Sequence, residues 1–182
     1  MSNAWIMVAL FLAQAFLLAD RSVVYGEELK TRYATIIYSN DELLNKFNQE
    51  IMLSRQLRLL LRNQKIFTLQ DEVKSKVDLV VEKIESVLEM FPDVLQFNMD
   101  VLPTADDVQQ VYLAKYGKRA DHIAYYSLKE KTIYISADDA NLRVMAHEIG
   151  HAVVDHYYKT PTPSKIHEVL AQYAEKHVDE DE

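Results

Sequence analysis

The amino-acid sequence predicts an α+β fold in which a small mixed or antiparallel sheet packs on helices. Short segments rich in β-branched and aromatic residues alternate with longer segments whose apolar residues recur at helical spacing. In addition, the chain has 182 residues with only three Gly and four Pro. This suits a single domain with a buried core and leaves little room for a disordered linker.

The first half of the chain contains an expected strand followed by two helices. Residues 32–39, RYATIIYS, have the composition of a strand. Ser39 and Glu42 have the spacing of a capping box, so we expect a helix to begin there and to run towards Asn63. A longer helix is expected over residues 70–91, because its apolar residues keep to one stripe.

The second half begins with an expected half-buried strand over residues 95–101, where apolar and polar residues alternate. A short helix over residues 103–116 should end at Gly117 as a left-handed cap. Residues 122–128 and 132–137 are expected to form a hairpin. Two further helices are then expected, over residues 139–158 and 165–177.

Residues 4–19, AWIMVALFLAQAFLLA, carry no charge and are apolar apart from Gln14. As a helix this segment would span about 24 Å, less than the ~30 Å hydrocarbon core of a bilayer. The length is typical of a secretory signal, and small residues stand near a candidate cleavage site at Ala13, Ala15 and Ala19. We therefore expect residues 1–19 to be a signal peptide or hydrophobic N-terminal segment. The protein would be exported to the periplasm or outside the cell, with no stable membrane span in the mature chain.

The charge and the cysteine count exclude several classes of function. Twenty-eight acidic and 20 basic residues give a formal charge of −8, and no basic stripe is present, which argues against a nucleic-acid partner. The acidic residues 179–182 are expected to form a solvated tail. The chain has no cysteine, so any metal must be held by nitrogen and oxygen atoms.

The octet MAHEIGHA carries the clearest candidate chemistry. On a helix, His147 and His151 lie one turn apart on the same face, close enough for one cation to bridge them. Glu148 is rotated by about 100° from His147, to a position from which a carboxylate can accept a proton from water at the metal. Gly150 costs a helix interior about 1 kcal/mol relative to Ala, which indicates close approach by another backbone.

A catalytic tetrahedral site needs a third protein ligand. Asp155 is excluded because it lies about 12 Å from His147 along the helix axis, although it could orient the His151 imidazole from outside the metal site. Glu168 is the leading candidate, with His167 and Glu175 as alternatives. Glu168 should lie beside the core-facing side of the last helix, near the small residue Ala171. The expected core-facing stripe consists of Ile166, Val169, Leu170 and Tyr173.

The sequence His147-Glu148-Ile149-Gly150-His151, followed by Glu168-Val169-Leu170-Ala171, resembles the gluzincin zinc metallopeptidases. Their thermolysin-like core pairs an HExxH helix with a later helix that donates a glutamate. TIYIS, residues 132–136, is similar to the edge strand that lines the cleft of that family. The resemblance covers residues 131–177. It implies a single zincin-like metallopeptidase domain over residues 28–178, which would hold Zn²⁺ through His147, His151 and Glu168 and use Glu148 as general base.

This resemblance implies a peptide or protein substrate, which could add as an extra strand beside residues 132–137. The side chains nearest in sequence that could stabilise the transition state are Tyr157, Tyr158, Tyr173 and His156. Such a small domain could need a protein partner to complete its cleft. Two alternatives remain: a non-catalytic zinc-binding or scaffold protein that retains the gluzincin-like fold, and a metal-free helical module.

Overall fold

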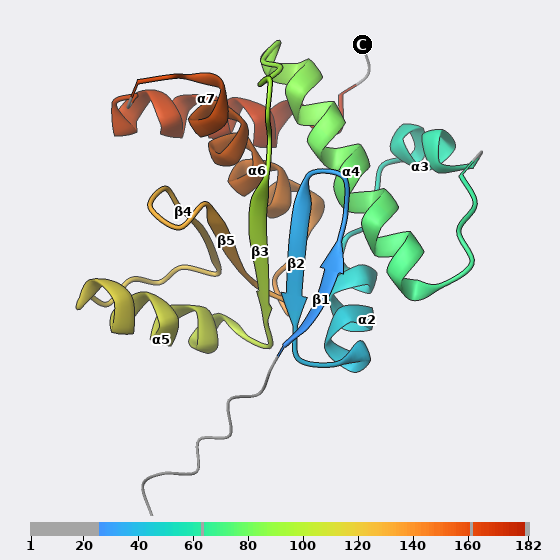
Figure 1. Cartoon of the computed structure of the whole chain (residues 1–182), viewed down its shortest axis with the longest axis horizontal. Coiled ribbons are helices and arrows are strands. Elements are labelled where there is room, and N and C mark those ends of the chain that lie inside the picture. The colour runs from blue at the N-terminus through green and yellow to red at the C-terminus, as the bar shows by residue number, and fades with distance from the viewer. Residues whose placement is uncertain (1–25, 63, 161, 181–182) are drawn as a thin grey trace, which may run out of the picture.

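The computed structural model describes residues 26–180 apart from residues 63 and 161 (Figure 1). The expected signal segment over residues 1–19 lies outside this part of the chain. Among the described residues, none of the helices combines the length and the hydrophobicity that a membrane span requires. Of the expected acidic tail, Asp179 and Glu180 are described, and the Asp179 carboxylate lies 3.2 Å from the Nε atom of Arg143.

The centre of the fold is a five-stranded mixed sheet with the strand order β1-β2-β3-β5-β4. β2 and β5 pair with β3 in parallel, whereas the outer pairs β1–β2 and β4–β5 are antiparallel. The expected α+β class with a mixed sheet is confirmed, as is the hairpin. The strands are β1 (Glu27–Lys30), β2 (Ala34–Tyr38), β3 (Phe97–Leu102), β4 (Ala124–Ser127) and β5 (Thr132–Ser136).

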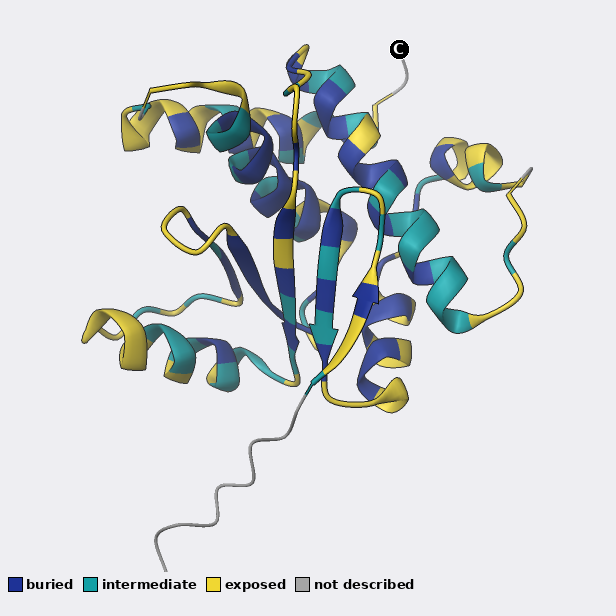
Figure 2. Cartoon of the chain, in the orientation of Figure 1, coloured by how far each residue is buried: buried dark blue, intermediate teal, exposed yellow. Residues whose placement is uncertain are grey.

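The described part of the chain has six helices arranged around this sheet. α5 covers one face, where Val108 packs with Tyr125 and Tyr134 of the sheet. The main core lies on the other face, between the sheet and α2, α4 and α6, and Figure 2 shows that buried residues gather there. The helices are α2 (Asp41–Glu50), α3 (Arg55–Leu61), α4 (Leu69–Leu88), α5 (Ala105–Tyr116), α6 (Leu142–Tyr157) and α7 (Ser164–His177).

Two expected helices have different boundaries in the structure. The chain after β2 forms two short helices instead of one, because the Ser54 side chain accepts a hydrogen bond from the Leu57 N–H and begins α3. The prediction of a capping box at Ser39 is wrong, since the side chain of Asn40 caps α2. The long helix α4 ends three residues earlier than expected, where Glu89 adopts the left-handed conformation.

α7 packs closely on α6. A Cβ atom at Gly150 would lie 3.1 Å from the Cα of Ala171 and 3.1 Å from the Cβ of Ala174. The close approach that Gly150 predicts is therefore confirmed. Small residues on both helices allow it, because no side chain separates the two backbones at this point.

The expected core-facing stripe of α7 is wrong for three of its four residues, whereas Leu170 packs against the core. Ile166, Val169 and Tyr173 are 45%, 57% and 47% exposed. The face that packs on α6 must fit against Gly150, so it carries small residues in place of the large apolar ones. That buried face consists of His167, Ala171, Ala174 and, just beyond the helix, Val178.

Gly150→Ala should destabilise the fold, although alanine has the higher helix propensity by about 1 kcal/mol. The new Cβ would meet backbone and Cβ atoms that cannot rotate away, so α7 must shift. We expect a net loss of about 1–3 kcal/mol in the free energy of unfolding, measured by chemical denaturation. Ala114→Gly, at an exposed position of α5, measures the change in stability that helix propensity alone causes. Unchanged or increased stability of Gly150→Ala would contradict the packing described.

Candidate metal centre

Helix α6 places both imidazoles of the octet on one side. The Asn141 side chain caps the helix and accepts hydrogen bonds from the backbone N–H groups of Arg143 and Val144, each at 3.1 Å. One turn further on, the rings of His147 and His151 meet edge to face with centroids 4.9 Å apart. Two neighbouring imidazoles on one helix face are one half of a metal site.

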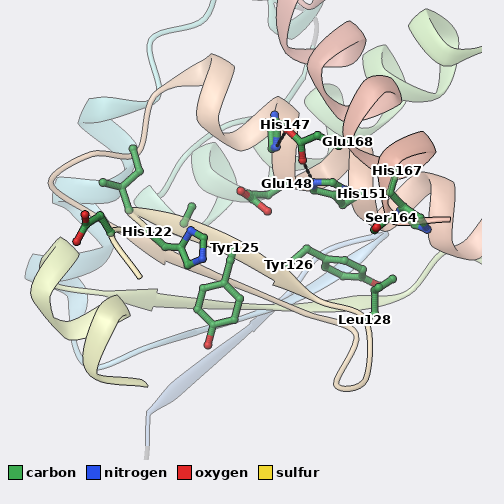
Figure 3. Close-up of a pocket in the computed structure, with 13 residues that line it drawn as sticks. His122, Tyr125, Tyr126, Leu128, His147, Glu148, His151, Ser164, His167 and Glu168 are labelled. Carbon is green, nitrogen blue, oxygen red and sulfur yellow. Dashed lines mark ion pairs between the residues drawn. The ribbon is translucent and has the colours of Figure 1, made fainter. Parts of the chain in front are cut away.

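Helix α7 brings the carboxylate of Glu168 to these imidazoles (Figure 3). Its two oxygens lie 3.9 Å from His147 Nε2 and 3.7 Å from His151 Nε2, and one ligand atom from each residue lies within 4.8 Å of the others. Ligands of a tetrahedral ion at about 2.0–2.2 Å lie about 3.3–3.6 Å apart. Small side-chain rotations therefore suffice for His147, His151 and Glu168 to hold one metal ion.

Glu175 and His167, the alternative third ligands, lie outside this group of three. Glu175 accepts a hydrogen bond from His147 Nδ1 at 3.0 Å, which fixes the tautomer of this ring and leaves its Nε2 lone pair for a metal. His167 is buried, and its ring stacks on that of His151 with centroids 5.9 Å apart. In addition, Gln172 donates a hydrogen bond of 2.7 Å to Glu168 Oε1. Glu175 and Gln172 therefore orient ligands from outside the metal group.

The carboxylate of Glu148 is buried beside the metal group, with only 7% of the residue exposed. Its Oε2 atom has no hydrogen-bond partner, and an unpaired buried charge is costly. Burial raises the pKa of Glu148 to about 8; the backbone N–H of Tyr126 lowers this pKa, while the charges of Glu168 and Glu175 raise it. A nearby cation would favour the ionised carboxylate.

The imidazole of His151 is also suited to a metal. Burial lowers its pKa to about 4, with a further contribution from His147, so the ring is neutral at neutral pH. Metals bind the neutral form of imidazole. The pocket in front of these residues contains no lysine or arginine among its lining residues, so no side-chain cation competes for the site. The residues present therefore fit a metal ion.

This pocket, of about 480 Å³, opens between α6, α7 and the strand β4. Figure 3 shows the Tyr125 and Tyr126 side chains of β4 on the side of the pocket opposite His147 and Glu168. The segment TIYIS was expected to be the edge strand along the cleft, and this is wrong. TIYIS is β5, whose two edges are occupied by β3 and β4, so the strand beside the pocket is β4.

Pocket residues outside the octet were not all foreseen. His122, Tyr125 and Tyr126 line the pocket, but they come from a strand and its preceding loop, and no spacing in the sequence connects them to the octet. The proposed transition-state residues Tyr157, Tyr158, Tyr173 and His156 lie outside the pocket lining. His156 instead bonds to the carbonyl of Gln96, and Tyr173 stacks on His177.

Asp155 does not bond to the ring of His151. Its carboxylate accepts hydrogen bonds from the Tyr126 hydroxyl, at 2.7 Å, and from the Lys131 ammonium group. It thereby ties α6 to the β4–β5 hairpin behind the pocket.

Comparisons with protein-family models, with curated proteins and with solved structures found no match to this chain. The class of site defined by the structure is thus a His-His-Glu group able to hold a metal ion beside a buried carboxylate.

The geometry predicts one bound divalent ion per chain. His147→Ala, His151→Ala and Glu168→Ala should each weaken Zn²⁺ binding by more than about 100-fold, because each removes one of three ligand atoms. Isothermal titration calorimetry measures the effect. His177→Ala, at the far end of α7, is the matched control and should bind as the wild type does. Unchanged affinity in Glu168→Ala would contradict the assignment of the third ligand.

Glu175→Gln should weaken Zn²⁺ binding by about 10–100-fold without removing the site. The amide keeps the size of the side chain but loses the charge that polarises the His147 ring. Competition with a chromophoric chelator measures the affinity. Full wild-type affinity would show that the hydrogen bond to His147 Nδ1 does not orient a ligand.

Proposed function

We propose that the chain is a zinc-dependent peptidase with a gluzincin-like catalytic core. The observation that carries the proposal is the buried Glu148 carboxylate, whose unpaired oxygen lies beside a His-His-Glu group in an open pocket. Two imidazoles and one carboxylate are a ligand set typical of catalytic zinc. The agreement between this group and the residues that resemble the gluzincin motif further supports the proposal.

Bound zinc would supply Lewis acidity to water and to the scissile carbonyl. Glu148 accepts the proton of the attacking water and returns it to the leaving amine. Burial makes its carboxylate more basic than an exposed glutamate, and the Tyr126 N–H holds one side of the carboxylate in place. Glu175 and Gln172 keep the ligand side chains oriented throughout.

The free edge of β4 offers a place for an extended peptide. β4 pairs with β5 on one side only, and it ends the strand order. The carbonyl of Ile123 accepts a hydrogen bond from the Ser136 N–H of β5. Because backbone groups of successive residues point to opposite edges of a strand, those of Ala124 and Tyr126 point to the free edge, towards the pocket. A substrate backbone could therefore bond to Ala124 as an added strand, with its scissile bond held near Glu148.

We propose His122, which lines the pocket, as the donor of a hydrogen bond to the carbonyl oxygen of the substrate. Its ring is packed edge to face on Tyr112, with centroids 4.7 Å apart, and it also contacts Tyr125. The Tyr126 hydroxyl, another donor among the lining residues, already donates its proton to Asp155. We also propose export of the protein, on the basis of the apolar segment over residues 4–19.

The exposed apolar side chains of α7, Ile166, Val169 and Tyr173, favour a second candidate function. In this alternative the protein binds zinc without catalysis and docks on a protein partner through α7. The two candidates share the metal site and differ in the role of Glu148.

Glu148→Gln should keep stoichiometric zinc and lose peptide cleavage by a factor of at least about 10²–10⁴, because the amide cannot accept the proton. Elemental analysis of the purified variant and hydrolysis of a quenched fluorescent peptide library measure the two properties. His147→Ala, which loses the metal, provides the second comparison. Equal cleavage by wild type and Glu148→Gln would exclude Glu148 as the base.

A further inference from the structure

A second pocket, of about 420 Å³, adjoins the candidate metal centre. Leu128 and His167 line both pockets, so the two are neighbours along the same surface. The second pocket lies between the β4–β5 hairpin, the end of α6 and the loop before α7. We call it the lysine pocket, because its lining includes Lys129, Lys131 and Lys159.

The charge of the lysine pocket is opposite to that of the metal centre. Asp155 is its only acidic lining residue, and this carboxylate is already paired with Lys131. Lys129 and Lys159 are exposed and form no ion pair with another residue in the described part of the chain. In a protein of net charge −8, two uncompensated ammonium groups in one pocket attract an anion.

Two further groups at the lysine pocket would also interact favourably with an anion. His167 is only 5% exposed, and its Nδ1 atom has no hydrogen-bond partner. α7 begins after Pro163 with no side-chain cap, so the positive end of the helix dipole lies beside the pocket. An anion in the lysine pocket would thus meet ammonium groups, a buried imidazole and an uncapped helix start.

The hairpin residue Lys131 adopts a left-handed conformation, with φ of 51°. Glycine or asparagine is usual at such a position, and another residue there costs about 1 kcal/mol. The ammonium group of Lys131 donates a hydrogen bond to the Asp155 carboxylate. The same carboxylate accepts a hydrogen bond from the hydroxyl of Tyr126, which lines the pocket of the metal centre. This chain of contacts fixes the boundary between the lysine pocket and the metal centre.

We propose that the lysine pocket is a specificity subsite that binds a carboxylate of the substrate next to the cleaved bond. The inference rests on the proposed peptidase function and names its substrate class. Carboxylates are the anionic groups that an unmodified peptide carries at neutral pH. The carboxylate has two sources: the side chain of Asp or Glu, or the free C-terminus of a short peptide.

The test uses the zinc-loaded Glu148→Gln protein, which should bind peptides without cleaving them. Fluorescence anisotropy compares peptides that carry Glu or Gln at each position in turn, each with a free or an amidated C-terminus. We expect about five- to tenfold tighter binding of the carboxylate member of one pair, decreasing with added salt. Preference for Glu assigns the side chain, and preference for the free acid assigns the C-terminus.

Lys129→Gln and Lys159→Gln, made in the same background, should each reduce this preference by about two- to fivefold, and the double variant should abolish it. Lys118→Gln, an exposed lysine outside both pockets, is the matched control and should leave the preference unchanged. Equal binding of charged and neutral peptides, or a preference that survives the double variant, would overturn the proposal.

Cleavage by the wild-type protein separates this proposal from the proposed function. Equal kcat/KM for Glu and Gln peptides, and also for free-acid and amidated peptides, would leave the peptidase intact and reject the subsite. Selective binding of carboxylate peptides by Glu148→Gln, together with no cleavage of any peptide by the zinc-loaded wild type, would support the lysine pocket and reject the peptidase.

Discussion

The candidate site depends on one packing constraint, the contact of Gly150 with Ala171 and Ala174. Because no side chain separates α6 from α7 at this point, the carboxylate of Glu168 reaches the imidazoles of His147 and His151. The same contact sets the register that places Glu175 on His147 Nδ1. A single close approach between two helices thus positions the three residues able to hold a metal and one of the partners that orient them.

The two adjoining pockets are lined by side chains of opposite charge. The metal pocket is lined by the buried Glu148 carboxylate and the exposed carboxylates of Asp121 and Glu168, with no lysine or arginine, and this charge favours a bound cation. The neighbouring pocket collects lysines instead. This separation of charge over two adjoining pockets favours a substrate that brings a neutral amide to one and an anion to the other. The proposed reaction and the proposed specificity therefore rest on different groups of residues.

The octet could be recognised from the sequence because the helical period alone places His147, Glu148 and His151 relative to one another. Gly150 and Ala171 likewise indicated a close helix contact. The burial of Val169 and Tyr173 on α7 was predicted wrongly, because the close contact at Gly150 decides which residues of α7 are buried. The position of β4 at the sheet edge depends on non-local strand order. The residues beside the pocket that come from β4 and its neighbouring loops, including His122 and Lys129, have no periodic signal in the sequence.

Anomalous X-ray diffraction at the zinc absorption edge tests the central claim most directly. Crystals of the protein loaded with one equivalent of Zn²⁺ should show one strong anomalous peak, within about 2.0–2.2 Å of His147 Nε2, His151 Nε2 and a Glu168 carboxylate oxygen. A peak at another set of side chains, or none at these three in protein that carries stoichiometric zinc, would contradict the account.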